Sequence, residues 1–291
     1  MQNNIGRFPI IIIGMHRSGT SMITRILGEL GLFLGKKKDK NQEARFFLNL
    51  NNWLLRQSGS SWDHPENIRY LLENIEIRTL VVKYIDHLLK TPRVISYLGM
   101  RNYLRFRNPF NLKIPWGWKD PRNTYTLPLW VDLFPKAKVI HIYRNGVDVA
   151  NSLMVRGMKE LKIVSRWMER LKWKHRFRNR PFPSIVSSVS CLSLEEGFRL
   201  WEVYTKRADT YITSLPSDRA LSIKYEDFLG EPSSFIKTLC EFSGINYDIA
   251  HISKVVSQIN TTRSNVYERD KKLHDFYELV KHSPQMIRYL Y

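Results

Sequence analysis

The chain has 291 residues, with 43% hydrophobic and 12% aromatic side chains and a formal net charge of +19. This composition predicts one large core and, because no Gly/Ser/Pro linker divides the chain, a single domain over residues 1–291. The charge favours anionic partners such as nucleotides, acidic glycans, phospholipid headgroups or nucleic acid. The sequence has only two cysteines, Cys191 and Cys240, which excludes a disulfide framework or a structural zinc site and favours a cytoplasmic location.

The first predicted element is a buried strand made of the four isoleucines at residues 10–13. It is too short to span a bilayer, and no cleavage-site pattern follows it. Apolar residues at helical spacing then predict a helix over residues 22–30, which ends near Gly31. The chain therefore opens with a strand, a loop and a helix.

The loop between this strand and helix, residues 14–21, reads GMHRSGTS. Its backbone N–H groups and the start of the helix would converge on one point, which suits an oxyanion. The loop is similar to the Walker A pattern, but Thr20 stands at the lysine position and Arg17 precedes the second glycine. This difference favours a phosphosulfate over a nucleoside triphosphate with magnesium. The alternative is an ordinary turn in which Thr20 or Ser21 caps the helix.

The remaining elements alternate between helices and strands. Periodicity predicts helices over residues 46–54, 68–89 (one or two helices, closed by Pro92), 145–154, 195–215 and 232–243, and strands over residues 139–143 and 220–225. This alternation predicts an α/β fold with a central parallel sheet flanked by helices. Ligands bind at the carboxyl ends of such strands, where the loops that start at Gly14, Lys119 and Arg144 would lie.

A second anion-binding element is predicted near the strand at residues 139–143. Arg144 ends this strand, and Ser152 and Arg156 follow it four residues apart, which places them on one helix face. Together they could hold another phosphate. Taken singly, each is more typical of a surface or packing residue.

With these two elements the chain resembles the sulfotransferases that use 3'-phosphoadenosine 5'-phosphosulfate (PAPS), especially bacterial members and the tyrosylprotein and carbohydrate branches. The family's 5'-phosphosulfate motif, [RK]-[ST]-G-T-[ST], matches residues 17–21. Its 3'-phosphate element, an arginine at a strand end and a serine eight residues later, matches Arg144 and Ser152, and one branch has an arginine at the position of Arg156.

Two further segments carry the same resemblance. Residues 119–122 (KDPR) look like the lysine-aspartate-proline segment that lines the family's reaction centre, and residues 223–228 (IKYEDF) look like a strand-end segment whose tyrosine lies near the nucleotide. The matches occur in family order and cover residues 10 to about 245. The resemblance implies a P-loop-type three-layer sandwich.

The resemblance also implies roles for individual residues. The residues implied to bind the donor are Arg17, Ser18, Gly19, Thr20, Ser21, Arg144, Ser152, Arg156 and Tyr225, and those implied to act in catalysis are Arg17, Lys119 and Glu43. Relatives often place a glutamate or histidine after the first helix as the general base. Glu43 is the first choice here, although it could be a solvated helix-cap residue, and the alternatives are His16, Asp39, Asp63 and His64. Arg263 loosely resembles a late cation that closes over the nucleotide.

The sequence indicates only the chemical class of the acceptor. Residues 159–180 are rich in lysine, arginine and tryptophan, within an expected basic helical insertion at about residues 156–195. This composition suits an acidic glycan, a peripheral contact with anionic lipid, or a plain exposed helix. We therefore expect a hydroxyl acceptor such as a glycan or lipid-linked saccharide, no metal and no specific nucleic acid. The rival hypotheses are a P-loop small-molecule kinase that uses ATP, and a non-catalytic polyanion-binding module.

Overall fold

The computed structural model describes residues 8–171, 185–260 and 264–291. The chain forms two compact units, residues 1–144 with 204–264, and residues 145–203 with 265–291. The strands are β1 (Ile10–Ile13), β2 (Gly117–Lys119), β3 (Lys138–Tyr143) and β4 (Ala220–Lys224), all in the first unit. The α-helices of the first unit are α1 (Thr20–Glu29), α2 (Arg45–Gln57), α3 (Ile68–Glu73), α4 (Ile75–Lys90), α5 (Ile95–Phe106), α6 (Asn123–Leu133), α9 (Tyr225–Gly230), α10 (Pro232–Ser243) and α11 (Ile249–Val256).

The four strands form one parallel sheet in the order β2-β1-β3-β4. Ile12 pairs with Lys119 on one side of β1, and Ile13 pairs with His141 on the other. Because the strands are parallel and in close register, their carboxyl ends meet at one edge of the sheet. The predicted convergence of the loops after β1, β2 and β3 is therefore confirmed.

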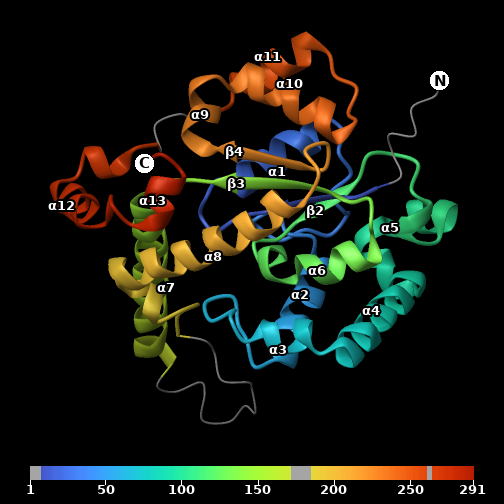
Figure 1. Cartoon of the computed structure of the whole chain (residues 1–291), viewed down its shortest axis with the longest axis horizontal. Helices are drawn as coiled ribbons and strands as arrows, with labels where there is room; N and C mark the ends of the chain where they lie inside the picture. The colour runs from blue at the N-terminus through green and yellow to red at the C-terminus, as the bar shows by residue number, and fades with distance from the viewer. Residues whose placement is uncertain (1–7, 172–184, 261–263) are drawn as a thin grey trace. The chain divides into compact units, whose positions relative to one another are not determined.

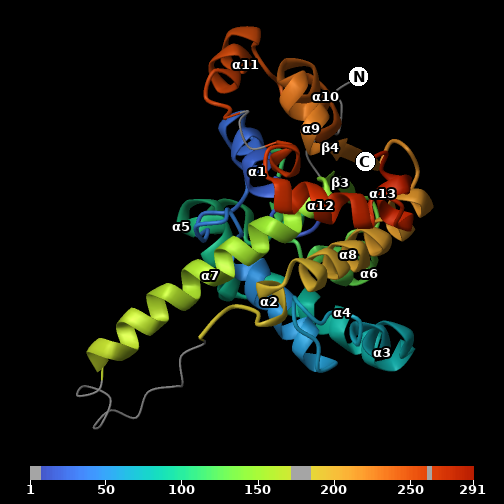
Figure 2. The same cartoon turned by 90° about the vertical axis from the view of Figure 1, so that its left-hand side faces the viewer.

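Helices cover both faces of the sheet. One face carries a core of α1, α10 and α11 side chains packed on Ile10, Ile12 and Ile140. Trp118 of β2 faces the opposite layer, where its ring stacks on Phe47 of α2 at 3.9 Å and an interplanar angle of 4°. Figures 1 and 2 both show α10 and α11 on one side of the strands and α2 on the other. The predicted three-layer α/β fold is confirmed.

The element boundaries differ from the predictions in a few places. The prediction for residues 68–89 left one or two helices open, and the structure has two, because the side chain of Asn74 accepts a hydrogen bond from the N–H of Ile77 at 3.0 Å and starts α4 anew. Tyr225 begins α9 instead of ending the preceding strand. Helix α6 was not predicted, since buried residues around it leave little periodicity and Pro128 lies inside it.

The second unit is helical. Its elements are α7 (Gly146–Leu171), η4 (Ser190–Leu192), η5 (Val266–Glu268), α12 (Lys271–Val280) and α13 (Pro284–Arg288), together with the first part of α8 (Leu194–Ser214), which continues into the first unit. The side chain of Asn145 accepts a hydrogen bond from the N–H of Val147 at 2.9 Å at the start of α7. The expected insertion at residues 156–195 begins within α7, while residues 172–184 lie outside the described part of the chain, as does Arg263.

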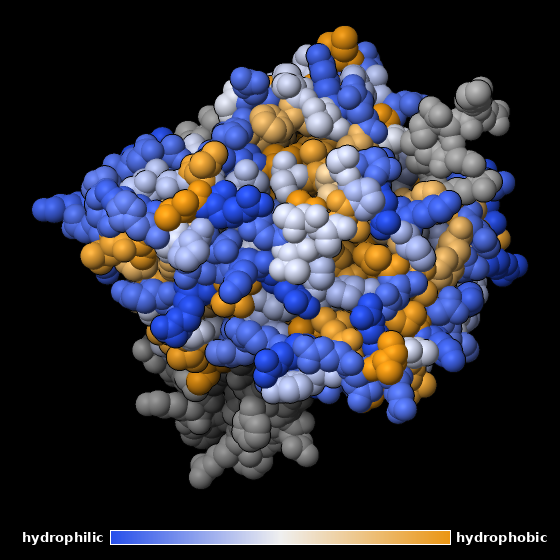
Figure 3. Space-filling view, in the orientation of Figure 1, coloured by the Kyte–Doolittle hydropathy of each residue, from blue (hydrophilic) through white to orange (hydrophobic). Residues whose placement is uncertain are grey.

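The surface view shows the polarity of one face of the molecule. The face shown in Figure 3 is mostly hydrophilic, with separate hydrophobic patches. In the described ranges, no helix has both the length and the apolar character needed to cross a membrane. A cytoplasmic location stays a prediction.

Candidate active site

The loop between β1 and α1 forms a cradle that depends on two glycines. A β-carbon on Gly14 (φ 136°) would lie 2.3 Å from the carbonyl oxygen of Ile142, and one on Gly19 (φ 90°) would lie 2.2 Å from the ring of Tyr225. Arg17 between them also has positive φ, 73°, so the backbone turns sharply before the helix. Only glycine can occupy positions 14 and 19 without moving the neighbouring strand end or ring.

The cradle has the polarity of an anion site. No acidic side chain occupies the first turn of α1, so the positive end of the helix dipole is not neutralised locally. The hydroxyl of Ser18 is fully buried, and it has no hydrogen-bond partner in the part of the chain that the structure describes. A buried hydroxyl of this kind needs a ligand or water as its partner. Arg17 is exposed at the same loop.

Tyr225 links this loop to the end of β3. Its ring packs against Gly19, as the 2.2 Å approach above requires, and the guanidinium carbon of Arg144 lies 4.9 Å from the ring centroid. Both side chains are buried, Tyr225 at 4% and Arg144 at 7% exposure. The predicted 5'-anion loop and the predicted 3'-phosphate arginine are thus joined through one aromatic ring.

Ser152 and Arg156 belong to the second unit, on α7. Arg156 donates a hydrogen bond to the hydroxyl of Ser187 at 3.0 Å, and its Nε lies 3.7 Å from the carboxylate of Glu160. Their predicted role toward the donor stays a prediction.

The buried side chains of Lys119 and Glu43 form a polar cluster with the half-buried Ser21 at the same edge of the sheet. The ammonium of Lys119 lies 3.0 Å from Oε1 of Glu43 and 3.3 Å from the hydroxyl of Ser21. That hydroxyl donates to the carbonyl oxygen of Asn41 at 2.8 Å, which holds the loop before α2 against α1. The fold therefore brings together three residues that the sequence proposed separately.

Burial sets the ionisation of Glu43. The residue is 4% exposed, and this desolvation, aided by the nearby carboxylate of Asp120, raises the pKa of Glu43 above its ordinary value. Lys119 and Arg122 act in the opposite direction, but less strongly. A carboxylate with a raised pKa is a better proton acceptor than an exposed glutamate.

Arg122 and Asp120 support this cluster from the turn after β2. Arg122 pairs with Asp120 at 2.9 Å and with Glu43 at 3.5 Å. Burial opposes the charge of Arg122, but the two carboxylates outweigh it and raise its pKa. Asp120 also accepts a hydrogen bond from Asn51 of α2 at 2.9 Å. Sequence reasoning assigned no role to Asn51, since its partner lies 69 positions away.

Three of the alternative bases make contacts of their own. The carboxylate of Asp39 accepts hydrogen bonds from the backbone N–H groups of Asn41 (2.9 Å) and Glu43 (2.8 Å), which shapes the loop that presents Glu43. Asp63 accepts a hydrogen bond from the hydroxyl of Ser61. The ring of His16 meets that of Trp62 edge-on at 4.7 Å.

A hollow of about 410 Å³ lies beside the same loop. It is lined by Arg25, four residues after Ser21 on α1, and by Lys38 and Gln42 of the loop that carries Glu43, with Glu29 as its acidic member. In the described ranges, neither Arg25 nor Lys38 forms an ion pair. The lining of the hollow therefore carries two cations and one carboxylate, a net positive charge, close in sequence to the reacting cluster.

The fold and this site define an α/β protein with a tight glycine-containing loop between its first strand and first helix, and a buried lysine–glutamate pair beside that loop. The model of the sulfotransferase family matches residues 9–248, which is most of the chain. The chain belongs to the sulfotransferase family.

Solved structures with a similar course of the chain were also found. The sulfotransferase STF1 of Mycobacterium tuberculosis is 14% identical (TM-score 0.49; 87% of this chain and 71% of that one). The sulfotransferase domain of the Synechococcus PCC 7002 olefin synthase is 17% identical (TM-score 0.45; 96% and 90%), and a sulfotransferase of Alicyclobacillus acidocaldarius is 14% identical (TM-score 0.45; 89% and 99%). Among the curated proteins, no relative matches the sequence.

Proposed function

We propose that this sulfotransferase takes its sulfuryl group from PAPS and transfers it to a hydroxyl acceptor, without a metal ion. The observation that carries the proposal is the contact chain from Gly19 through Tyr225 to Arg144, which joins two cationic sites at neighbouring strand ends. A donor with an anionic group at both its 5' and 3' ends needs two such sites.

In this proposal the loop after β1 binds the 5' end and Arg144 binds the 3'-phosphate. The groups proposed for the 5'-phosphosulfate are the side chain of Arg17 and the backbone amides and hydroxyls of Ser18, Gly19, Thr20 and Ser21. The buried hydroxyl of Ser18 supports this assignment. Tyr225 would lie along the adenosine. Ser152 and Arg156 are proposed as further 3'-phosphate ligands on the family resemblance alone.

The chemical step is an in-line attack. A lone pair of the acceptor oxygen forms a bond to sulfur, and the bond between sulfur and the bridging oxygen breaks, leaving 3',5'-adenosine bisphosphate. Glu43 takes the acceptor's proton, and Lys119 and Arg17 stabilise the charge that builds on the bridging and sulfuryl oxygens. The 3.0 Å contact between Lys119 and Glu43 supports placing these two roles next to each other.

The Arg144→Ala variant tests the 3'-phosphate site. We expect it to lower the affinity for 3',5'-adenosine bisphosphate by about 10- to 100-fold, because a charge-assisted hydrogen bond is lost. The affinity for 5'-AMP should change by much less. Isothermal titration calorimetry with both nucleotides measures the difference.

The exposed Arg101→Ala variant on α5 is the matched control and should bind both nucleotides like the wild type. An equal loss for the two nucleotides in Arg144→Ala would contradict the assignment. Tighter binding of magnesium-ATP than of the bisphosphate by the wild type would instead favour the kinase hypothesis. Salt-sensitive binding of polyanions without nucleotide binding would favour the non-catalytic module.

The hollow beside the Glu43 loop favours an acidic acceptor, such as a glycan that already carries a carboxylate or sulfate. We expect the Arg25→Gln, Lys38→Gln double variant to raise KM for acidic acceptor oligosaccharides by about tenfold, with kcat and bisphosphate affinity unchanged, because it removes two charges outside the reacting cluster. A mass-shift screen of acidic and neutral glycans, phenols and lipids supplies the acceptors. Equal KM changes for acidic and neutral acceptors would show that charge is not what the hollow recognises.

A further inference from the structure

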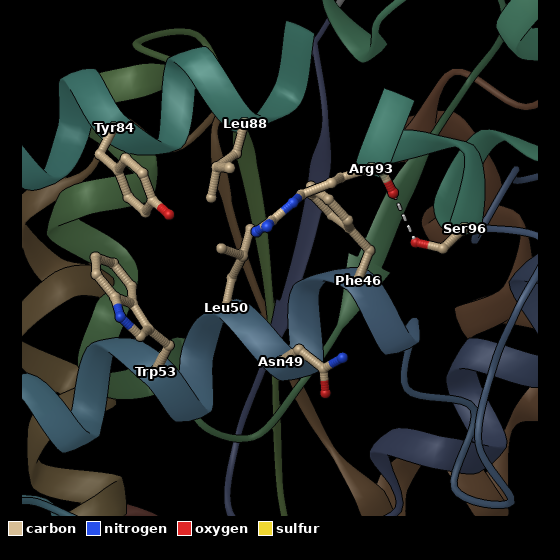
Figure 4. A pocket seen from close by; sticks show the side chains of 8 residues that line it. All are labelled: Phe46, Asn49, Leu50, Trp53, Tyr84, Leu88, Arg93 and Ser96. Carbon is tan, nitrogen blue, oxygen red and sulfur yellow. Dashed lines mark hydrogen bonds between the residues drawn. The ribbon is translucent and has the colours of Figure 1, made fainter. Parts of the chain in front are cut away.

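A second pocket lies between α2 and α4. It has a volume of about 360 Å³ and is lined by Phe46, Asn49, Leu50, Trp53, Tyr84, Leu88, Arg93 and Ser96. Figure 4 shows the side chains of α2 on one side of it and those of α4 on the other. This volume is within the range of small-molecule sites. None of its lining residues belongs to the groups assigned above.

The pocket has one apolar end and one cationic end. The rings of Trp53 and Tyr84 lie 5.3 Å apart at an interplanar angle of 49° and form the apolar end. At the other end the side chain of Arg93 extends toward Leu50 and Leu88 (Figure 4). Tyr84 is 43% exposed, so its ring is not covered by the fold.

The charge of Arg93 is not balanced in the pocket. None of the eight described lining residues is acidic, and Arg93 forms no ion pair in the described ranges. Arg93 is exposed, so an anionic ligand can reach its guanidinium, whose fixed fork of N–H donors suits a carboxylate or a sulfonate. A ligand that suits both ends must carry a flat or aliphatic body and one anionic group.

We propose that this pocket is a binding site for a small amphipathic anion, an aromatic or acyl group that bears one carboxylate or sulfonate. The anionic group meets Arg93, and the apolar body packs against Trp53 and Tyr84. The inference does not depend on the identity of the sulfuryl donor, because no donor-binding residue lines the pocket.

Calorimetry with naphthalene-2-sulfonate and its neutral analogue 2-naphthalenemethanol tests the proposal. We expect saturable binding of the sulfonate to the full chain, at least tenfold weaker in Arg93→Gln, with binding of the neutral analogue changed less than twofold. Tyr84→Ala should lower the affinity for both ligands, because it removes part of the apolar wall of the pocket. The exposed Arg101→Gln variant, outside the pocket, should bind both like the wild type.

Three results would overturn the proposal. They are no saturable binding of the sulfonate, equal effects of Arg93→Gln and Arg101→Gln, and displacement of the sulfonate by 3',5'-adenosine bisphosphate. The last would place the ligand in the donor site. Arg93 is exposed, so its replacement should leave the fold intact, and the thermal midpoint of each variant checks this.

Discussion

Replacement of Glu43 by Gln should lower kcat by about 10²- to 10⁴-fold, the usual contribution of a general base. The amide keeps the shape of the side chain and can still accept a hydrogen bond from Lys119, but it cannot take the proton of the acceptor hydroxyl. The measurement is the rate of 3',5'-adenosine bisphosphate formation with an acceptor found by mass-shift screening.

The pH dependence of the wild type gives a second readout. Glu43 works as a base only when it is deprotonated, so activity should fall as the pH decreases through its pKa. Because burial and Asp120 raise that pKa, the fall should occur at a higher pH than for an exposed glutamate. The acid limb should be absent in Glu43→Gln.

The control for this variant is Glu73→Gln, which changes an exposed carboxylate at the end of α3. It should have wild-type kcat and the wild-type pH profile. Glu43→Gln should also keep wild-type affinity for the bisphosphate, which shows that the donor site is intact. Retention of more than half of kcat by Glu43→Gln would remove Glu43 as the base and return His16 and His64 to consideration.

The Lys119→Met variant should lose about 10²- to 10³-fold in kcat, because it removes the ammonium that we propose stabilises charge on the leaving oxygen, while the buried volume is largely kept. Lys119 is one of the groups that lower the pKa of Glu43. Its loss should therefore also move the acid limb of the residual activity to higher pH. A variant with unchanged kcat would contradict the role of Lys119.

Measurements of thermal stability distinguish the proposed catalytic role of Lys119 and Glu43 from their role in packing. Lys119 is 1% exposed and Glu43 4%, and neutralising one member leaves the charge of the other buried without its nearest counter-charge, at a cost of up to about 3–5 kcal/mol. Glu43 would keep only its longer contact with Arg122, at 3.5 Å. The Lys119→Met, Glu43→Gln double variant should recover much of the lost thermal midpoint and none of the lost activity. Recovery of activity together with stability would mean that the single variants lost rate only by unfolding.

Several features of the fold could be predicted because they depend on short stretches of sequence. The four isoleucines of β1 predict a strand buried on both faces, and the spacing of Gly14 and Gly19 predicts a tight loop before a helix. The backbone angles of both glycines and the close approach of Ile142 to Gly14 agree with that prediction. Helix α6 was missed, because a helix buried on most sides shows no apolar periodicity.

By itself, the sequence determined the parallel sheet and the residues at its strand ends, since strand periodicity and glycine spacing are local properties. Only the tertiary structure decided that Glu43, 76 positions from Lys119, is the carboxylate in contact with it, and that Asp39 shapes the turn instead. The tertiary structure also brought together the residues that line the pocket around Arg93. The physical reason is that burial and partners across long separations set the ionisation and contacts of a polar side chain, and residue spacing along the chain contains neither.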